Sequence, residues 1–296
     1  MKIFSYTTPK GLTQIGLRLD NRDYNFSRAW ELYKQFKSGG KGPSLNFLQL
    51  MVEADFFHVA TISEVLDTLR EFRPLDDLVI RERVQLLPPI GRPQKILCIG
   101  RNYAEHAREL EHEVPDEPLF FAKSPSALIG SGQAIKLPQK VGRVDFEGEL
   151  AVVMGRRAKN ISEKYAWEFV AGFTLLNDVT ARDLQRQDIE AGKPWFRAKS
   201  FDTFCPCGPF LVPREAMEVD DVKLEVRVNG ETKQSASTAQ MVFSVPALVA
   251  YLSKFCTLEP GDLIATGTPA GVGPLQPGDL VECEIDEIGV LKNHVE

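Results

Sequence analysis

The segment RVDFEGELAVVMG at residues 143–155 restricts how this chain can fold more than any other. Its pattern is that of a strand, in which successive side chains point to opposite faces. Asp145, Glu147 and Glu149 would then share one face, roughly 7 Å apart at every second position. Like charges so close repel each other, and the repulsion grows where water is scarce. The fold must therefore either leave this face in solvent or bring positive charge to it.

A further carboxylate lies downstream, where the apolar run of FTLLNDVTARDLQ ends in Asn177 and Asp178. Asp178 would either point into a site at the strand end or N-cap a short helix that begins in VTARDLQ. Glu147, Glu149 and Asp178 together would form an all-oxygen site with no histidine or cysteine nearby in the sequence. Such a site favours Mg²⁺ or Mn²⁺ with positions open to water and substrate, and its spacing matches no EF-hand loop. A bound cation would relieve the repulsion between the carboxylates.

The segment RNYAEHAREL has helical spacing and places His106 three residues before Glu109, on the same helix face. A carboxylate beside an imidazole orients the ring and raises its basicity, as a general base requires. Without further context the pair reads as a surface ion pair. His106 is nevertheless the best candidate for a base, because the other three histidines lie in an apolar helix, in an acidic loop and near the chain end.

Two turn-rich stretches contribute further candidates. Lys199 lies in AKSFDTFCPCGPF, and Thr268 lies in IATGTPAGVG, whose glycines let the backbone approach a ligand closely. The second stretch does not have the pattern of a phosphate loop. Each stretch taken alone reads as an ordinary loop.

The composition excludes several classes of partner. The 296 residues carry a net charge of −6, which does not suggest a nucleic acid or an anionic membrane as partner. No apolar run reaches the roughly 18 residues of a membrane span, and the N-terminus lacks the apolar region of a signal peptide. The five cysteines are scattered, as expected for free thiols in a reducing cytoplasm. The chain is therefore expected to be cytoplasmic.

The order of elements predicts two domains. Residues 1–90 begin with short strands and continue with helical spacing over 26–36 and 44–72, before a Pro- and Gly-rich linker at 86–94. Residues 91–296 are mostly strand-like, and Ser244 is expected to N-cap a helix over 243–255. Strands are expected at 169–180, 222–231, 262–268 and 279–293, with a tight turn at VNGE. The sequence thus predicts a β-rich α+β catalytic domain behind a small mixed N-terminal domain, without alternating βαβ units.

At this point the motifs can be compared with known families. GRNYAEHAREL, VDFEGELAVVMG, NDVTARDLQ, AKSFDTFCPCGP, VNGE, the stretch from MVFSVPALVAYL to GTPAGVG, and GDLVECEIDEIGVLKN occur in this order. Over about residues 92–296 the chain resembles the fumarylacetoacetate hydrolase superfamily, specifically the fumarylacetoacetate hydrolase domain-containing proteins. The resemblance implies a mixed β-sandwich roll, a homodimer, and Mg²⁺ or Mn²⁺ held by three carboxylates.

The resemblance also implies roles for individual residues. The metal ligands would be Glu147, Glu149 and Asp178. A lid segment would carry the pair His106 and Glu109, and Lys199 would bind the substrate or stabilise a developing anion. Arg182, Gln185 and Thr268 would help to hold the substrate, and Arg101 and Lys123 are further candidates.

These parts suit a small anionic 2-oxo acid as substrate, because a divalent cation chelates its ketone and carboxylate oxygens and stabilises an enolate. The predicted function is metal-dependent cleavage of a C–C bond in a 2-oxo or 2,4-dioxo acid, of the acylpyruvate hydrolase or oxaloacetate decarboxylase type. His106 would activate water in the hydrolase. Proton transfer between keto and enol forms uses the same electron sink, and an isomerase or hydratase acting on a 2-hydroxymuconate-like diacid from aromatic breakdown is the main alternative. A non-enzymatic metal-binding protein that retains the site is the remaining one.

Overall fold

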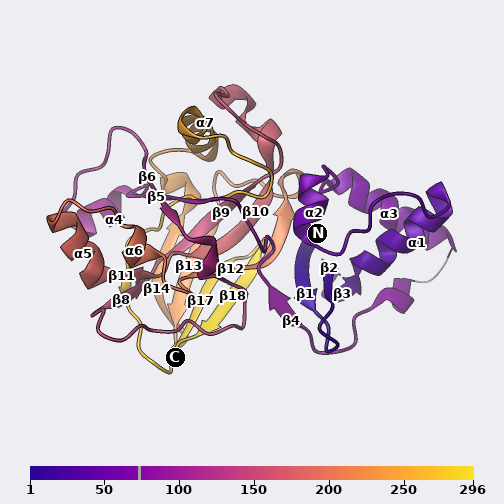
Figure 1. The fold of residues 1–296 in the computed structure, drawn as a ribbon, viewed down its shortest axis with the longest axis horizontal. Helices are drawn as coiled ribbons and strands as arrows, with labels where there is room; N and C mark the ends of the chain where they lie inside the picture. Colours follow the sequence, from indigo (N-terminus) through magenta and orange to yellow (C-terminus); the bar gives the residue numbers. More distant parts are fainter. Residues whose placement is uncertain (73–74) are drawn as a thin grey trace.

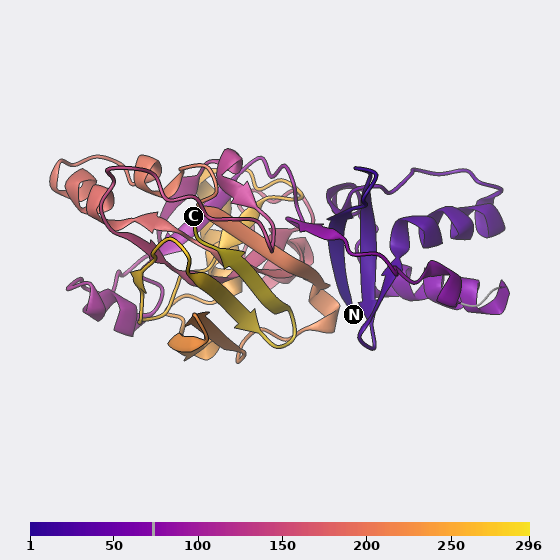
Figure 2. The ribbon, with the colours of Figure 1, turned by 90° about the horizontal axis from the view of Figure 1, so that it is seen from below.

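The computed structural model describes residues 1–72 and 75–296, and it has a smaller N-terminal part beside a larger remainder (Figure 1). The N-terminal part contains β1 (Lys2–Thr7), β2 (Thr13–Leu19), β3 (Arg22–Asn25), α1 (Phe26–Ser38), α2 (Leu48–Glu53), α3 (Val59–Phe72) and β4 (Gln85–Leu87). Seen from below, β1 to β3 stand between the remainder and the helices α1 and α3 (Figure 2).

The expected helix over 26–36 is confirmed. The expected helical stretch over 44–72 is helical only in part, because it is divided into two helices. The side chain of Asn25 caps α1 by accepting a hydrogen bond from the Arg28 amide at 2.9 Å. The second stretch is two helices, because Asp55 adopts a left-handed backbone with φ +57° between α2 and α3. The spacing of the apolar residues does not locate such a break, since it remains helical on both sides.

The largest sheet has 11 strands and extends through both parts of the chain. Its main path is β3-β2-β1-β12-β10-β9-β15-β5-β6, and β1 pairs with β12 through Ile3 and Leu211. The strands of the larger part are β5 (Ile96–Gly100), β6 (Leu119–Lys123), β9 (Gly148–Met154), β10 (Val170–Asn177), β12 (Cys205–Pro213) and β15 (Leu263–Ala265), with β7 (Leu128–Ile129) beside β12. One apolar core includes residues of α2, β9 and β15, so the two parts share buried surface. The domain boundary near residue 90 stays a prediction.

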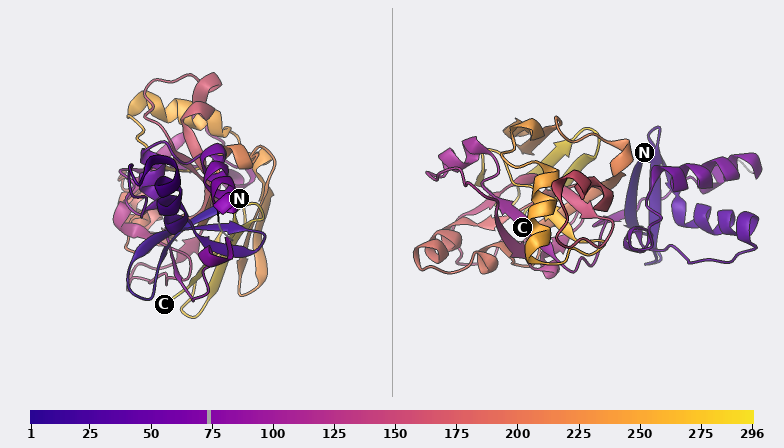
Figure 3. Two further views of the ribbon diagram at one scale, coloured as in Figure 1. Left: turned by 90° about the vertical axis from the view of Figure 1, so that its right-hand side faces the viewer. Right: turned by 90° about the horizontal axis from the view of Figure 1, so that it is seen from above.

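Two further sheets complete the larger part. One has the order β14-β13-β17-β18, built from β13 (Lys223–Val228), β14 (Glu231–Ser237), β17 (Leu280–Ile285) and β18 (Gly289–His294). It packs on β9 and β10 across a second apolar core, which gives the layered, sheet-rich α+β fold that the sequence predicts. The other sheet joins β11 (Thr180–Ala181), β8 (Val144–Phe146) and β16 (Gly273–Pro274). Views from the end and from above show the layers and the helices that flank them (Figure 3).

The remaining helices are α4 (Ala104–Glu109), α5 (Arg182–Glu190), α6 (Phe196–Lys199) and α7 (Val245–Phe255). The Ser244 hydroxyl accepts a hydrogen bond from the Ala247 amide at 3.4 Å, so the predicted N-cap of α7 is confirmed. Asn229 and Gly230 both have positive φ and form the predicted turn of VNGE. The expected strand over 279–293 is instead the hairpin of β17 and β18, and the expected strand over 262–268 ends at Ala265. Among the described helices, none is both long and apolar enough to cross a membrane.

The close approach of β10 to β12 predicts the effect of a methyl group at Gly172. A Cβ there would overlap the carbonyl oxygen of Val212 in β12. This oxygen belongs to the backbone of a paired strand, so it cannot move away by a side-chain rotation. We expect Gly172→Ala to lower the free energy of unfolding by about 2–3 kcal/mol, measured by urea denaturation. The matched control is Gly91→Ala, since a Cβ at Gly91 meets no atom within 4 Å. Equal stability of the two variants would show that the sheet adjusts at no cost.

Candidate active site

The acidic segment crosses from one sheet to another at Glu147. β8 belongs to the small sheet and β9 to the large one, and Glu147 lies at the break between them. Asp145, Glu147 and Glu149 are only 0, 4 and 1% exposed, so the alternative of a solvated strand face is wrong. The repulsion between these carboxylates must be offset inside the protein.

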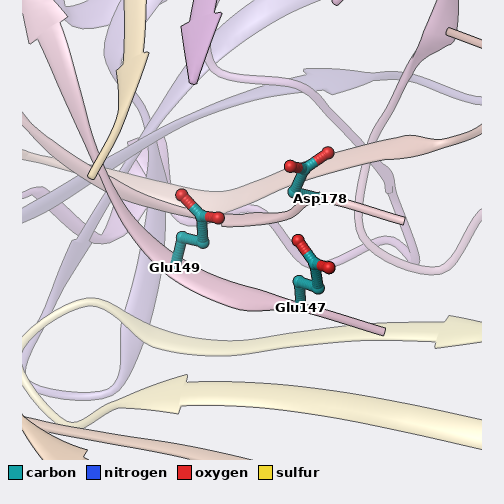
Figure 4. A group of neighbouring side chains, drawn as sticks. All are labelled: Glu147, Glu149 and Asp178. Carbon is teal, nitrogen blue, oxygen red and sulfur yellow. The ribbon is translucent and has the colours of Figure 1, made fainter. Parts of the chain in front are cut away.

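Glu147, Glu149 and Asp178 point toward one another (Figure 4). One carboxylate oxygen from each lies within 4.8 Å of the other two. Asp178 directly follows β10 and is tied to the acidic segment, because its amide donates to the carbonyl of Glu147 at 2.8 Å. The alternative that Asp178 N-caps a helix is wrong, since α5 starts at Arg182 and the cap position is Ala181.

Three cations oppose these carboxylates. The Lys199 ammonium, at the end of α6, lies 2.8 Å from Oε2 of Glu147 and 2.5 Å from Oδ2 of Asp178. The Lys123 ammonium, at the end of β6, lies 2.5 Å from Oδ1 of Asp178.

Arg182 is the third cation. Its Nε donates to Asp145 at 2.8 Å, its Nη2 donates to Glu147, and its Nη1 donates to Oε1 of Gln185 at 2.6 Å. The predicted substrate-holding pair of Arg182 and Gln185 thus also braces the acidic segment.

The charges divide the three carboxylates into two kinds. Burial acts to raise the pKa of Glu147, but Lys199 and Arg182 outweigh it and hold the pKa well below its usual range. Burial raises the pKa of Glu149 well above its usual range, and the nearby Asp178 and Glu147 raise it further. Within residues 1–72 and 75–296, Glu149 forms no ion pair, and its Oε2 accepts only the Gly267 amide, at 2.7 Å. The site therefore has buried negative charge beside open space, where a divalent cation fits and an all-oxygen donor set suits it.

The segment after β5 closes over the carboxylates and carries the predicted pair. Nδ1 of His106 lies 3.2 Å from Oε2 of Glu109, whose Oε1 accepts the Gly271 amide at 3.0 Å. The pKa of Glu109 is lowered, because the hydrogen bonds from His106 and Gly271 outweigh the effect of burial. The buried side chain of Asn102 anchors the start of this segment through the backbone of Phe243 and Thr266. His106 is buried and held, so the pair is not a surface ion pair.

A cavity of about 40 Å³ brings these groups together. Eight of the nine predicted site residues line it: His106, Glu147, Glu149, Asp178, Arg182, Gln185, Lys199 and Thr268. The ninth, Glu109, does not line the cavity but contacts His106. A site for one water needs about 10–15 Å³ on this measure, so the enclosed part of the cavity is small, and a ligand larger than a few atoms would extend into its open mouth. The roles of these residues remain predictions, but the structure places all of them at one site.

Sequence reasoning missed Gln234 of β14, which lies in the four-stranded sheet that packs on β9 and β10. Its amide nitrogen donates to the Thr268 hydroxyl at 2.8 Å and to the Pro269 carbonyl at 2.7 Å. Its amide oxygen accepts the amide of Gly148, between two of the carboxylates, at 3.1 Å. Thr268 in turn donates its hydroxyl to the Gly148 carbonyl at 2.9 Å. A glutamine on an exposed-looking hairpin gives no sequence signal for this contact.

The chain was compared with known proteins. The family model described as fumarylacetoacetate (FAA) hydrolase C-terminal matches residues 95–296. A mitochondrial oxaloacetate tautomerase of Xenopus laevis is 45% identical over 226 residues, covering 74% of this chain and 70% of the relative.

Solved structures match over the whole chain. A fumarylacetoacetate hydrolase of Exiguobacterium antarcticum has a TM-score of 0.81 at 33% identity, covering 100% of this chain and 99% of that one. A 2-hydroxyhepta-2,4-diene-1,7-dioate isomerase of Mycobacterium marinum has a TM-score of 0.71 at 34% identity, covering 100% and 98%. These relatives carry enzyme names that differ in the reaction.

The unequal charge environments predict opposite effects of two similar substitutions. Glu149→Gln replaces an unpaired carboxyl whose ionisation burial opposes by a neutral amide, so we expect a higher melting temperature in chelator and an Mg²⁺ affinity lower by about tenfold or more. Glu147→Gln leaves Lys199 and Arg182 without their carboxylate, so we expect a lower melting temperature as well as weaker Mg²⁺ binding. Thermal unfolding and titration calorimetry measure both. Undiminished Mg²⁺ affinity in either variant would contradict its role as a ligand.

Gln234→Ala tests whether the second sheet positions the site. The change removes three hydrogen bonds and leaves the Gly148 amide without its partner, so we expect Mg²⁺ affinity to fall about tenfold. The control is Gln187→Ala, which changes an exposed side chain of α5. An equal affinity in the two variants would show that Gln234 supports only the fold.

Proposed function

The chain belongs to the fumarylacetoacetate hydrolase family, and we propose that it is a divalent-metal enzyme that tautomerises a small 2-oxo acid between its keto and enol forms. Oxaloacetate represents the substrate class. The observation that carries this proposal is the position of His106. Its Nδ1 is engaged by Glu109, while Nε2 has no hydrogen-bond partner among the described residues and the ring lines the cavity that contains the carboxylates.

The residues present fit a metal cofactor. Glu147, Glu149 and Asp178 would hold Mg²⁺ or Mn²⁺, since they supply three oxygen donors around one point and Glu149 lacks a cation. When bound, the ion supplies Lewis-acid stabilisation of negative charge on the carboxylate and 2-oxo oxygens of the substrate.

The chain's own residues carry the proton transfer. Nε2 of His106 would take a proton from C3 of the keto acid, as the C3–H electron pair becomes the C2–C3 double bond. Glu109 keeps the ring in place and stabilises its protonated form. The ammonium of Lys199 would face the negative charge that develops on the 2-oxo oxygen. The protonated His106 would then return its proton to this oxygen, which completes the enol and restores the neutral imidazole. The return reaction uses the same groups in reverse.

Two considerations favour tautomerisation over hydrolysis. Tautomerisation needs no second reactant in the site, whereas hydrolysis needs a bound water. Mitochondrial proteins named oxaloacetate tautomerases, from Xenopus laevis, Rattus norvegicus and Bos taurus, are 45–46% identical to this chain over 74–80% of its length. Because these relatives carry enzyme names, they do not support the alternative that this chain is a non-enzymatic metal-binding protein.

C–C bond cleavage is the second candidate, because His106 and Glu109 could equally activate water against the distal carbonyl of an acylpyruvate. The similarity over the whole chain to a protein named fumarylacetoacetate hydrolase supports this reaction. Decarboxylation of oxaloacetate would use the same three carboxylates without a water. An isomerase acting on an unsaturated di- or tricarboxylic acid is supported by two mycobacterial structures that carry such isomerase names, at 33–34% identity.

The test follows enol oxaloacetate by its ultraviolet absorbance, with Mg²⁺ or Mn²⁺ and with chelator, while a coupled assay measures pyruvate. We expect the purified protein to accelerate loss of the enol without a matching release of pyruvate, and only with metal. Release of pyruvate at the rate of enol loss would replace the proposal by C–C cleavage. Metal ions without protein provide the blank, because they catalyse both reactions slowly.

His106→Gln tests the proton carrier. We expect kcat to fall by about 10²–10⁴-fold, the usual contribution of a general base, while Mg²⁺ affinity stays the same. His294→Gln is the matched control, since His294 is exposed near the end of β18 and does not line the cavity. A loss of less than threefold in His106→Gln would remove this residue from the mechanism.

A further inference from the structure

The side chains that line the cavity form a buried floor and an open mouth. The floor consists of the carboxylates with Lys199, His106 and Thr268, all of them buried. The mouth is formed by partly or largely exposed residues: Arg101, Leu110, His112, Ile189 and Trp195. The proposed function uses the floor and leaves the mouth without a role.

Arg101 is held at the mouth by an unusual backbone. It directly follows β5 and has φ +60°, in the left-handed region that residues other than glycine seldom adopt. The next residue, Asn102, is fully buried and fixed by three hydrogen bonds, so the surrounding structure imposes the turn. Strained backbone of this kind persists where packing enforces it and is concentrated at functional sites.

The Arg101 side chain is positioned by an aromatic ring. Its guanidinium lies 6.0 Å from the centre of the Trp195 ring, and Trp195 packs against Phe121 with ring centres 5.3 Å apart. A Cβ on Gly100 would come within 3.1 Å of Trp195, so the ring lies directly on the backbone that precedes Arg101. The Arg101 guanidinium donates no hydrogen bond among the described residues, so its N–H groups are available to a ligand.

Arg101 has no acidic partner. In the described part of the chain it forms no ion pair or hydrogen bond with a carboxylate, whereas Arg182 and Arg197 are each bonded to at least one. Burial accordingly lowers the pKa of Arg101. Burial and the nearby Arg101 also lower the pKa of His112. Arg101 therefore supplies the mouth with a positive charge that no carboxylate among the described residues neutralises.

We propose that Arg101 is the specificity-determining residue of the site and binds the anionic group at the far end of the substrate. The site would then select 2-oxo dicarboxylates over 2-oxo acids with a neutral tail. This inference rests on the proposed function, because it takes the 2-oxo acid end to lie on the floor. A planar guanidinium binds a carboxylate through two parallel hydrogen bonds, and the small cavity brings the two ends of a short diacid within reach of both groups.

The experiment compares oxaloacetate with its 4-methyl ester, which keeps the 2-oxo acid end and lacks the distal charge. Arg101→Asn removes the cation and retains a residue that tolerates the left-handed backbone. We expect it to lower kcat/KM for oxaloacetate about 10–100-fold, the range for a charged hydrogen-bonded pair, mainly through KM. The ester should change by less than about threefold. Equal losses on both substrates, or none on oxaloacetate, would overturn the inference.

Three controls separate this role from others. Arg108→Asn removes an exposed positive charge from α4 outside the cavity and should leave the preference for the diacid intact. Arg101→Lys keeps the charge without the planar fork and should lie between the wild type and Arg101→Asn, which also guards against a folding defect in the latter. Oxalate reaches only the floor, so its calorimetric affinity in Mg²⁺ should be the same in the wild type and in both Arg101 variants.

Binding distinguishes failure of the inference from failure of the proposed function. If the protein turns over neither oxaloacetate nor its ester, calorimetry with the same two compounds still measures the preference. Tighter binding of the diacid that Arg101→Asn abolishes would support the mouth site while the proposed reaction fails. Equal affinity of the wild type for the two compounds would overturn the mouth site.

Discussion

The structure depends on the balance of charge around one buried point. Asp145, Glu147, Glu149 and Asp178 lose nearly all contact with water, and Lys123, Arg143, Arg182 and Lys199 form ion pairs with three of the four carboxylates. Charges in such surroundings interact far more strongly than in water, so removing one partner leaves an uncompensated ion. Among the described residues, Glu149 is the member of this group that has no cationic partner. The fold thus leaves one carboxylate unpaired at the place where a divalent ion would have three oxygen donors.

The fold holds this cluster rigid by joining elements that are distant in the sequence. The acidic segment passes from the small sheet to the large one, β10 delivers Asp178, and Gln234 reaches across from the second sheet to bind the backbone between Glu147 and Glu149. The loop after β15 contributes the Gly267 amide to Glu149 and the Gly271 amide to Glu109. The same loop therefore supports both the carboxylate floor and the segment with the imidazole.

The sequence predicted those site residues whose signal is local. The alternation around Glu147, the apolar run that ends before Asp178, and the spacing of His106 and Glu109 each depend only on residues close together in the sequence. It could not predict that Gln234 meets Gly148, because that contact depends on how two sheets pack. The sequence also could not locate the break at Asp55, since the positive φ of this residue ends the helix while the apolar residues around it keep the spacing of a helix. Arg101 was only one of several further candidates, because its proposed importance lies in a backbone angle and in the absence of an acidic neighbour, and neither is visible in the sequence.

Under the proposed function, the floor and the mouth of the cavity have different tasks. A floor of carboxylates, a lysine and an imidazole would stabilise negative charge beside a carbonyl, and this demand is shared by tautomerisation, decarboxylation and C–C hydrolysis. The reactions differ in what else must fit, which is a water for hydrolysis and a departing fragment for cleavage. Those requirements would fall on the mouth, which Arg101 and Trp195 line and where Arg101 places positive charge. Substitutions at the mouth would therefore change the preference among substrates, whereas substitutions on the floor would impair every reaction of this kind.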